Sequence, residues 1–472
     1  MILNTLRSHN CLSYLPKDVR TLLKTPRMSV KLRNVPPGEY LHTAGITNSL
    51  RNVPRAVIPE CLEIDFSTDG ATLDKSGQIQ IWPIQCRIAN ISNSRPEIVG
   101  IYRGKRKPLS AVEFFQDFVV EVNTVISDGG IMFEGSRLPI ALRCFIADAP
   151  ARAFVLNHKG HTSFHPCSKC KMSGEFHERR PVFLGIDNVA RTDKEYAEQR
   201  DKDHKQGDTP LSHLPIGMVR QVPYESMHLL YIGIGKKLMS AWVSGQYSIS
   251  SRLPSSKVAE ISARLIYLVQ YYPRDFNRPP RPIEEYPNYK ATEILHFLLY
   301  TGPVILNGVL PDELHQHFLL LHTALRCLSS ASLTKEQLRV ADLALRLYVR
   351  KCPTYYGISF MSFNVHGLLH VVEDVKILGP LELYSALAYK NNMRIFRRYC
   401  KKPHLPLQQI ARRKAEESNC HDRNLNRKSL RDHQTSKLVT VRKKHNTGPI
   451  PKELSGAQQY SELQTQKFTL GL

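Results

Sequence analysis

Alternating apolar and polar positions predict β-strands in the part of the chain that follows the first 60 residues. In CLEIDFSTDG the apolar side chains Leu62, Ile64 and Phe66 alternate with other residues, and the segment ends at an Asp-Gly turn. Two more segments with strand character, residues 79–91 and 97–104, follow it. Three turn-bounded strands in succession predict an antiparallel meander.

Helical spacing replaces this alternation in residues 111–126, where apolar side chains recur three or four positions apart. The next segment, 138–147, is almost continuously apolar, as expected of a strand buried on both faces, and it ends at Asp148. Three strands, a helix and a buried strand that ends in an acid form the opening of an RNase H-like fold. We therefore predict an α/β (α+β) fold with an RNase H-like mixed sheet, interrupted by a large helical insertion.

The same pattern divides the chain into five segments. Residues 1–60 are basic, loop-rich and interrupted by prolines, and residues 61–175 form the first part of the core. Residues 176–360 are mostly amphipathic helices with proline-rich connectors, which we interpret as the helical insertion. The last part of the core, 361–414, precedes a basic tail, 415–472, that we expect to be disordered or only locally helical.

The charge balance of the chain is strongly basic. Lys and Arg number 65 against 42 Asp and Glu, so the formal net charge is +23. Such an excess favours polyanionic partners, because Lys and Arg release the counterions condensed on phosphates. A basic protein kept soluble by self-repulsion is an equally good interpretation of the charge alone.

The sequence predicts an intracellular, reducing compartment. Charges and a proline come too early for a signal peptide, and no apolar run approaches the roughly 18 residues of a membrane helix, so we expect no membrane partner. Of the ten cysteines only Cys167 and Cys170 form a close pair. In a reducing compartment such a pair is more typical of a metal site than of a disulfide.

The Cys167-Ser-Lys-Cys170 segment has the ligand spacing of a zinc knuckle but has no second cysteine pair nearby. The best further donors are His366 and His370, which are four residues apart and hence on one face of a helix. Together the four would form a closed, structural Cys₂His₂ site for zinc that staples the helical insertion to the sheet. The histidine pair by itself is better explained as surface or core residues of an amphipathic helix.

Two acids stand at predicted strand ends. Asp69 follows the first strand and Asp148 ends the buried one. Phosphodiester chemistry needs carboxylates that converge on two Mg²⁺ ions about 3.5–4 Å apart, and adjacent strands could bring these acids together. Taken alone, both residues are better explained as ordinary turn residues.

Six segments of the chain resemble the transposases of CACTA-type DNA transposons and their relatives in animal genomes. The resemblance covers roughly residues 1–415, and the Asp-Ala-Pro-Ala and Cys-x-x-Cys stretch is its most specific part. In chain order the segments are LPKDVRTLLKTP (15–26), STDGATLDKSGQIQIWPI (67–84), IADAPARAFVLNHKGHTSFHPCSKCKMSGE (146–175), VPYESMHLLYIGIGKKLM (222–239), YKATEILHFLLYTGPVIL (289–306) and NVHGLLHVVEDVKILGPLELYSALAYKNNM (364–393).

The resemblance implies a DDE-type nuclease in which two Asp and one Glu hold two Mg²⁺ ions. By position, Asp69 is the first acid and Asp148 the second, while Lys390 stands where the family has its Glu. A Lys at that position would repel Mg²⁺ and has no acceptor to offer it. Glu373 and Glu382 lie more than two helical turns from position 390, so we do not expect either to replace the missing acid.

The resemblance also bears on the zinc site and on Glu225. The cysteine and histidine pairs are arranged as in the zinc site of the distantly related catalytic subunit of the V(D)J recombinase, which makes the four-ligand zinc site the favoured interpretation. Glu225 stands where relatives usually carry Asp, and the sequence does not indicate its role.

Basic residues concentrate after position 393 and are our candidate contacts to double-stranded DNA. A nuclear localisation signal or a solvated charge run would look alike. No module that reads DNA bases is visible before residue 60, so we expect binding without base readout. The candidates are Arg394, Arg397, Arg398, Lys401, Lys402, Arg412 and Arg413.

The function predicted from all this is a nuclear, transposase-derived DNA-binding protein whose ancestral two-metal cleavage and strand transfer are lost because Lys390 replaces the third acid. The resemblance implies a homodimer, since two transposon ends must be cut together. One alternative is a transposase that still cuts DNA. Another is a zinc-stabilised protein-interaction scaffold without DNA cleavage. Metal-dependent nicking and salt-sensitive DNA affinity would distinguish the three.

Overall fold

The computed structural model divides the chain into two units, one formed by residues 28–411 and the other by 1–27 with 412–472. The residues that the structure describes are 2–26, 29–50, 57–73, 79–92, 94–273, 275–402, 404–429, 440–445, 459–464 and 469–471.

A seven-stranded mixed sheet is the centre of the larger unit. Its strands run in the order β1-β2-β6-β5-β3-β9, with the short β4 paired to β5. The pairing of β3 with β9 is parallel, and the others are antiparallel. The mixed α/β class predicted from the sequence is confirmed. The strands are β1 (Arg33–Val35), β2 (Gly38–His42), β3 (Leu62–Thr68), β4 (Ala71–Thr72), β5 (Gln80–Ile88), β6 (Glu97–Gly104) and β9 (Ile140–Ile146).

The β1–β2 hairpin was not predicted, because the prolines of residues 1–60 indicated loops. Pro36 and Pro37 form its turn, and Tyr40 and Leu41 are buried where β2 pairs with β6. Prolines that exclude a helix are compatible with a tight turn that leads from an edge strand into the sheet.

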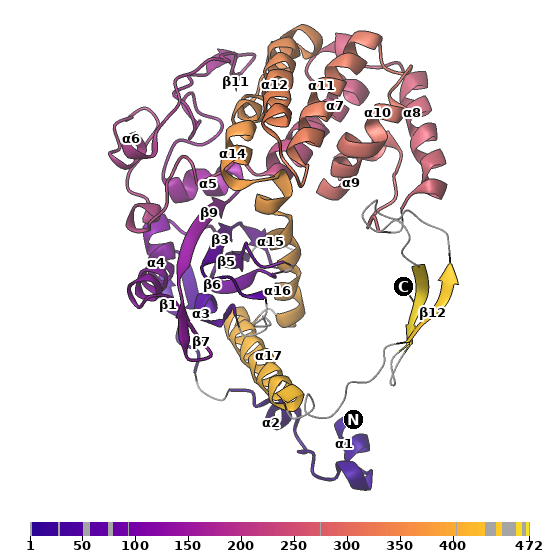
Figure 1. The fold of residues 1–472 in the computed structure, drawn as a ribbon. Helices are drawn as coiled ribbons and strands as arrows, with labels where there is room; N and C mark the ends of the chain where they lie inside the picture. Colours follow the sequence, from indigo (N-terminus) through magenta and orange to yellow (C-terminus); the bar gives the residue numbers. More distant parts are fainter. Residues whose placement is uncertain are drawn as a thin grey trace. The chain divides into compact units, whose positions relative to one another are not determined.

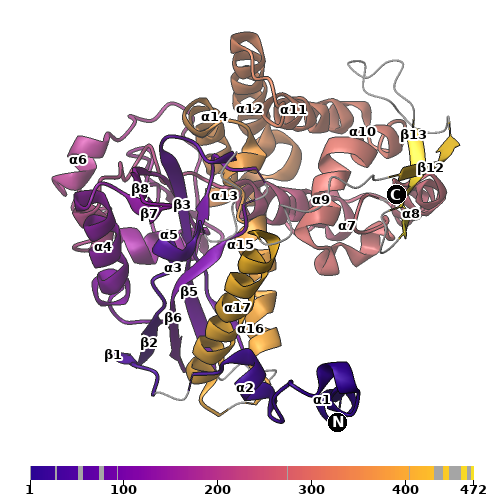
Figure 2. The same ribbon diagram turned by 60° about the horizontal axis from the view of Figure 1, so that its bottom comes forward.

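Helix α4 (Ala111–Ser127) covers one face of the sheet, as the spacing of residues 111–126 predicts. Ser110 caps its N-terminus by accepting the N–H of Glu113. Phe118 packs on Phe66 of β3 with ring centroids 5.1 Å apart, and Phe66 stacks on Phe145 of β9 at the same distance. Figures 1 and 2 both show α4 on one side of the sheet, with α15 (Leu387–Asn392) and α16 (Arg394–Tyr399) on the other.

The opposite face of the sheet is joined to the C-terminal helices by a buried ion network. The Asp65 carboxylate in β3 is fully buried and accepts two hydrogen bonds from Arg143, at 2.7 and 2.5 Å. Arg143 and Arg87 both donate to the carbonyl oxygen of Leu383, just before α15. The charge of Asp65 is therefore compensated within the fold, so this acid serves the packing of the sheet against the following helices.

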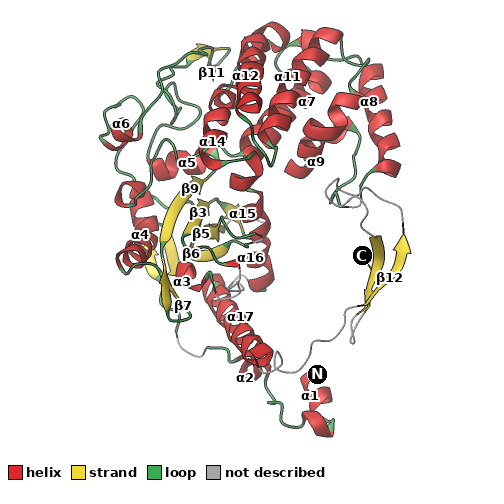
Figure 3. Ribbon diagram, in the orientation of Figure 1, coloured by secondary structure: helices red, strands yellow, loops and turns green. Residues whose placement is uncertain are grey.

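Residues between α5 (Ala149–Leu156) and α15 are mainly helical, and Figure 3 shows these helices gathered apart from the strands of the large sheet. Two stretches, η4 (Met227–Gly235) and η8 (Phe297–Thr301), have π-helical hydrogen bonding. Two short hairpins, β7–β8 (Ile131–Phe133, Ser136–Leu138) and β10–β11 (Glu175–His177, Arg180–Val182), were not predicted. The remaining described α-helices of this unit are α3 (Gly45–Asn48), α6 (Asp193–Ala197), α7 (Lys236–Ser244), α8 (Ser255–Leu268), α9 (Ala291–His296), α10 (Gly302–Ile305), α11 (Asp312–Leu328), α12 (Lys335–Tyr356), α13 (Phe363–Gly367) and α14 (Val371–Leu378).

The basic tail contains more regular structure than the sequence predicts. The smaller unit holds α1 (Ile2–Arg7), α2 (Val19–Leu23) and a three-stranded antiparallel sheet of β12 (Thr440–His445), β13 (Gln459–Gln464) and β14 (Thr469–Gly471). Helix α17 (Pro406–Ser429) begins in the larger unit, where Leu407 and Ile410 are buried. These two apolar side chains anchor the start of the helix, although the surrounding sequence is strongly basic. Among the described helices, none combines the length and apolar character needed to cross a membrane.

Candidate metal centre and acidic site

Cys167, Cys170, His366 and His370 come together in the larger unit. The two Sγ atoms are 3.6 Å apart, each Sγ is 3.4 Å from one imidazole Nε2, and the two Nε2 atoms are 3.1 Å apart. A tetrahedral zinc ion at ordinary bond lengths has ligand separations of about 3.8 Å (S–S), about 3.6 Å (S–N) and about 3.4 Å (N–N). The four donors therefore form a cluster of the size and shape that could hold a metal ion such as zinc.

The cluster joins segments about 200 residues apart. Both cysteines lie in the loop that follows α5, while His366 is in α13 and His370 immediately precedes α14. Three of the four ligands are almost fully buried, and all four coordination positions would be filled by protein. A metal ion bound there would have no open position for water or substrate, as in structural zinc sites.

Arg191 and Tyr224 hold the cysteine loop in place. The Arg191 Nε–H is shared between the carbonyl oxygens of Cys167 and Cys170, at 3.0 Å each, and its Nη1 donates to Asp201 at 2.6 Å. The Tyr224 hydroxyl is 3.2 Å from the Cys167 sulfur. These contacts order the loop around its ligands, as outer-shell partners do in metal sites.

A buried ion pair links the cysteine loop to the histidine helix. The Lys169 ammonium, between the two cysteines, lies 2.5 Å from the Asp374 carboxylate, and both side chains are almost fully buried. The other oxygen of Asp374 accepts the N–H of Tyr224 at 2.8 Å. Asp374 is on α14, one turn after His370, so the pair connects the two halves of the cluster next to its ligands.

The surroundings of the two thiols favour one thiolate in the pair, which would attract a cation. Burial opposes ionisation of Cys167, but the thiol of Cys170 and the imidazoles of His370 and His366 outweigh it and hold the pKa of Cys167 well below its usual value. The bond to Cys167, together with burial, raises the pKa of Cys170, because the pair shares one proton. Metal ligands are thiolates, and ion binding would release that proton. His366 departs from the usual pattern, since its buried Nδ1 has no partner among the described residues.

Asp69 and Asp148 lie at the same edge of the sheet. Asp69 follows β3 and Asp148 follows β9, and these two strands are parallel neighbours. Asp148 caps α5 by accepting the N–H of Ala151 at 2.8 Å. Burial raises the pKa of Asp148 and the negative charge of Asp69 adds to this effect, although the Ala151 N–H and His228 oppose it. The sensitivity of Asp148 to Asp69 is what two neighbouring carboxylates produce.

Lys390 of α15 meets the first of these acids. Its ammonium nitrogen is 2.6 Å from the Asp69 carboxylate, 321 residues away in sequence. The Lys390 side chain is about half exposed, at 47%, and that of Asp69 is 19% exposed. A cationic side chain therefore neutralises one of the two carboxylates at this edge.

Glu225 and His228 form a dyad beside these residues that sequence reasoning missed. Glu225 is buried and accepts the N–H groups of Met227, His228 and Ala386. Its carboxylate also accepts the His228 Nδ1–H at 2.5 Å, and His228 is the second residue of the π-helix η4.

The protonation of the dyad follows from these bonds. Burial opposes the charged form of both groups. The bond and charge of His228 nevertheless lower the pKa of Glu225. The bond to Glu225, with smaller contributions from Asp148 and Asp69, raises the pKa of His228. The only trace of the dyad in the sequence is the Glu-x-x-His spacing within VPYESMHL, where Glu225 but not His228 was considered from the sequence.

The two other acids considered from the sequence lie elsewhere. Glu382 accepts the Tyr231 hydroxyl at 2.7 Å, and Glu373 pairs with Lys376 at 2.5 Å on the surface of α14. Neither has a described contact with Asp69, Asp148 or Lys390. Each of these two glutamates is bound to a partner of its own, Tyr231 or Lys376.

The candidate DNA-binding residues are at the protein surface. Arg394 and Arg398 of α16, with Lys401 and Lys402 after it, are exposed. Arg412 and Arg413 of α17 are exposed as well, and Arg413 pairs with Glu416 at 2.6 Å. The side chain of Arg397 lies outside the described residues.

A comparison of this sequence with protein-family models and with curated proteins found no match.

Proposed function

We propose that this chain is a transposase-derived DNA-binding protein with an RNase H-like DDE core that has lost two-metal DNA cleavage and strand transfer. The order of four strands supports the core. The antiparallel series β3, β5, β6 is followed by α4 and then by β9, parallel to β3. This is the succession of strands and helix on which the sequence-based prediction of that core rests, with one acid after each parallel strand.

The ion pair of Lys390 with Asp69 carries the proposal. It brings the residue at the position of the family Glu into contact with the residue at the position of the first Asp. Two-metal phosphodiester chemistry needs carboxylates that gather two cations. In this chain a side-chain ammonium already occupies one carboxylate, and a Mg²⁺ ion would have to displace it and then lie beside a positive charge.

The Cys₂His₂ cluster supports a structural zinc site in the same proposal. Its ligands come from the loop after α5 and from the segment that leads into α14. A zinc ion there would fasten the helical part of the chain to the end of the sheet that carries Asp148. Zinc would supply rigidity, because the protein fills every coordination position.

The exposed basic residues support DNA as the partner. Arg394, Arg398, Lys401 and Lys402 offer cations that phosphates can reach, and the net charge of +23 favours any polyanion. Contacts of this kind position a protein on DNA without reading its sequence. Nuclear localisation and pairing of two copies belong to the same proposal.

Plasmid nicking tests the proposal. We expect the native chain not to nick supercoiled DNA with Mg²⁺ or Mn²⁺, and Lys390→Glu to gain cleavage because a third carboxylate replaces the ammonium. Asp148→Ala in the Lys390→Glu background should abolish that cleavage. Lys335→Glu, the same charge change at an exposed residue of α12, is the matched control and should remain inactive. Asp148-dependent nicking by the native chain would contradict the proposed loss of activity.

A protein-interaction scaffold remains the second candidate, favoured by exposed aromatic residues. Tyr267 and Tyr271 are 62% and 65% exposed on the helical part of the chain, and their ring centroids lie 5.6 Å apart. Large exposed apolar groups that gather in one region often mark protein contacts. The slope of DNA affinity against salt concentration separates the two candidates, since a scaffold without DNA affinity has no such slope.

A further inference from the structure

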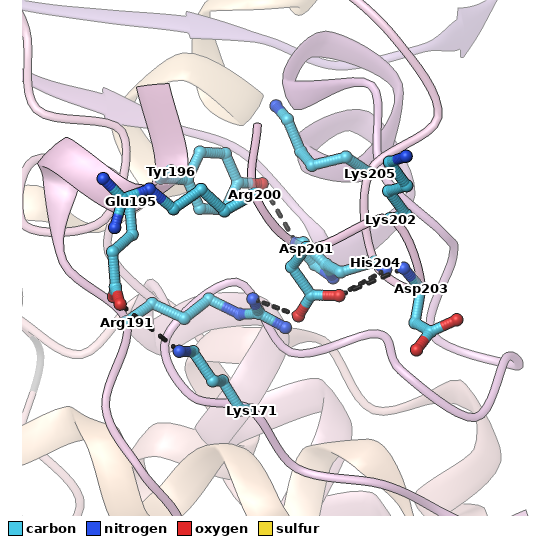
Figure 4. Close-up of a pocket in the computed structure, with 10 residues that line it drawn as sticks. All are labelled: Lys171, Arg191, Glu195, Tyr196, Arg200, Asp201, Lys202, Asp203, His204 and Lys205. Carbon is cyan, nitrogen blue, oxygen red and sulfur yellow. Dashed lines mark hydrogen bonds and ion pairs between the residues drawn. The ribbon is translucent and has the colours of Figure 1, made fainter. Parts of the chain in front are cut away.

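A cavity of about 380 Å³ lies beside the cysteine loop, between that loop, helix α6 and residues 200–205. Its lining contains five basic and three acidic side chains, with Tyr196 and His204. Figure 4 shows a central space with Arg191 and Lys171 on one side and Tyr196 on the other. The volume is that of a small-molecule site.

The acidic side chains of the lining are largely neutralised by neighbours. Asp201 pairs with Arg191 at 2.6 Å, and Glu195 pairs with Lys171 at 3.3 Å. The Asp203 carboxylate points away from the central space in Figure 4. His204 contributes no charge at neutral pH, because burial and the charge of Arg191 lower its pKa to about 4.

Lys205 is a buried cation without an acidic partner. It is only 8% exposed, and among the described residues no carboxylate lies within ion-pair distance of its ammonium. The ammonium donates to the carbonyl oxygen of Leu156 at 3.0 Å and lies 4.3 Å from the centre of the Tyr196 ring. Burial lowers its pKa to about 8, the negative charge of Asp208, beyond ion-pair distance, opposes this effect, and the positive charge of Arg191 adds to it. Buried charges are normally paired, so this lysine lacks an anion.

Two further cations stand at the same cavity. Lys202 is exposed and has no described partner, and Arg200 is exposed and pairs with Glu198, outside the cavity lining. Two contacts hold this side of the cavity in place. The Lys159 N–H donates to the His204 carbonyl at 2.9 Å, and the rings of His158 and His204 stack with centroids 4.4 Å apart. The cations are therefore presented by a preformed wall, which lowers the cost of binding.

We propose that this cavity binds a phosphate ester, with Lys205 as its buried cation and Lys202 and Arg200 at its rim. Arg and Lys donors from several directions match a group that carries several acceptor oxygens. The cavity is larger than a lone phosphate, so space remains for the organic part of the ester. The ester can be a DNA phosphodiester or a free phosphorylated metabolite. The site does not depend on the function proposed above, because a free phosphate ester would occupy it without DNA.

The test uses the full zinc-loaded chain with inorganic phosphate, pyrophosphate and a deoxynucleoside 5′-monophosphate as probes. Calorimetric titration and thermal unfolding should show saturable binding of at least one probe to the native chain. Lys205→Met should weaken that binding by about tenfold or more, since a charged hydrogen bond is lost. Absence of binding by all three probes and by DNA, or equal binding by Lys205→Met, would overturn the proposal.

Lys237→Met is the matched control. Lys237 is also a buried ammonium above an aromatic ring, 3.8 Å from the centre of Tyr247, but it does not line the cavity. It should bind the probes as the native chain does. If Lys205→Met does not fold, the exposed pair Lys202→Met and Arg200→Gln serves instead and should weaken binding several-fold.

A short DNA duplex identifies the source of the phosphate. If DNA is the ligand, Lys205→Met should lower the salt slope of duplex affinity by about 0.9 and the small probes should compete with the duplex. An unchanged slope with weakened probe binding assigns the site to a free ester. Either result can occur whether or not Lys390→Glu nicks plasmid DNA, so failure of this inference and failure of the proposed function are distinguishable.

Discussion

The Cys₂His₂ cluster and the acidic site at the ends of β3 and β9 are assembled in the same way but differ in completeness. Each joins segments that are hundreds of residues apart, and each would gather cations. In the cluster all four donors are present and are held by Arg191, Tyr224 and the Lys169–Asp374 pair. In the acidic site a lysine stands against Asp69.

The two sites therefore contribute differently to the stability of the fold. The cluster is buried, so removal of one donor would leave the remaining polar groups without solvent or a metal ion. The acidic site is partly open to water, and an ammonium can satisfy Asp69 there at little cost. A lysine at position 390 is therefore compatible with an intact core, whereas the cluster does not tolerate loss of a donor.

The largest expected effect comes from breaking the cluster. Cys167→Ser should release the metal ion and reduce the free energy of unfolding by at least about 4 kcal/mol, because the loss of a structural metal is among the most destabilising changes. Zinc content by atomic absorption and thermal unfolding measure it. Cys352→Ser makes the same atomic change at another fully buried cysteine and should keep the zinc. Unchanged melting and zinc content in Cys167→Ser would rule the site out.

An intermediate effect is expected at the dyad, and it should depend on pH. The folded pKa of His228 lies above its unfolded value, so its stabilisation is complete below about pH 6.5 and is lost as pH rises through the folded pKa. His228→Gln should therefore cost about 2 kcal/mol at pH 6 and less at alkaline pH. Urea unfolding of both proteins at saturating zinc gives the difference. A difference that grows with pH would contradict the raised pKa.

The smallest effect is expected at the lysine itself. Lys390→Met removes the ion pair with Asp69 and should change the free energy of unfolding by less than about 1 kcal/mol, because the ammonium is half exposed and screened. The same urea titration measures it, with Lys376→Met as an exposed control on α14 that also loses one ion pair. A loss comparable to that of Cys167→Ser would mean that both sites hold the fold together and would remove the contrast between them.

Much of the sheet followed from local patterns in the sequence. The alternation at Leu62, Ile64 and Phe66 and the apolar run 138–147 correspond to β3 and β9, since a two-residue period and a doubly buried strand leave clear traces. The β1–β2 hairpin left no such trace, because its strands are short and its turn is a proline pair. Local helicity was expected in the tail, and the buried apolar side chains of Leu407 and Ile410 anchor the start of α17.

The candidate sites were predictable to different degrees. The spacing of Cys167 and Cys170 is visible in the sequence as that of a metal-binding pair. Their proximity to His366 and His370 was favoured by a resemblance, and the structure brings the four donors together. The dyad of Glu225 with His228 was visible only as two residues three apart. Its place near Asp148 depends on how η4 packs, which no local pattern records.

Local properties of this protein follow directly from its amino-acid sequence: the strand and helix periods, the spacing of the cysteine pair, the basic charge and the identity of the residue at position 390. Which of these residues contact one another depends on the tertiary fold. Lys390 contacts Asp69, and Lys169 pairs with Asp374, although the members of each pair are far apart in the chain. The cavity that Lys205 lines is likewise formed by several separate elements. The reason is physical: side-chain periodicity reports on neighbours within a few residues, whereas these contacts arise from the packing of whole elements.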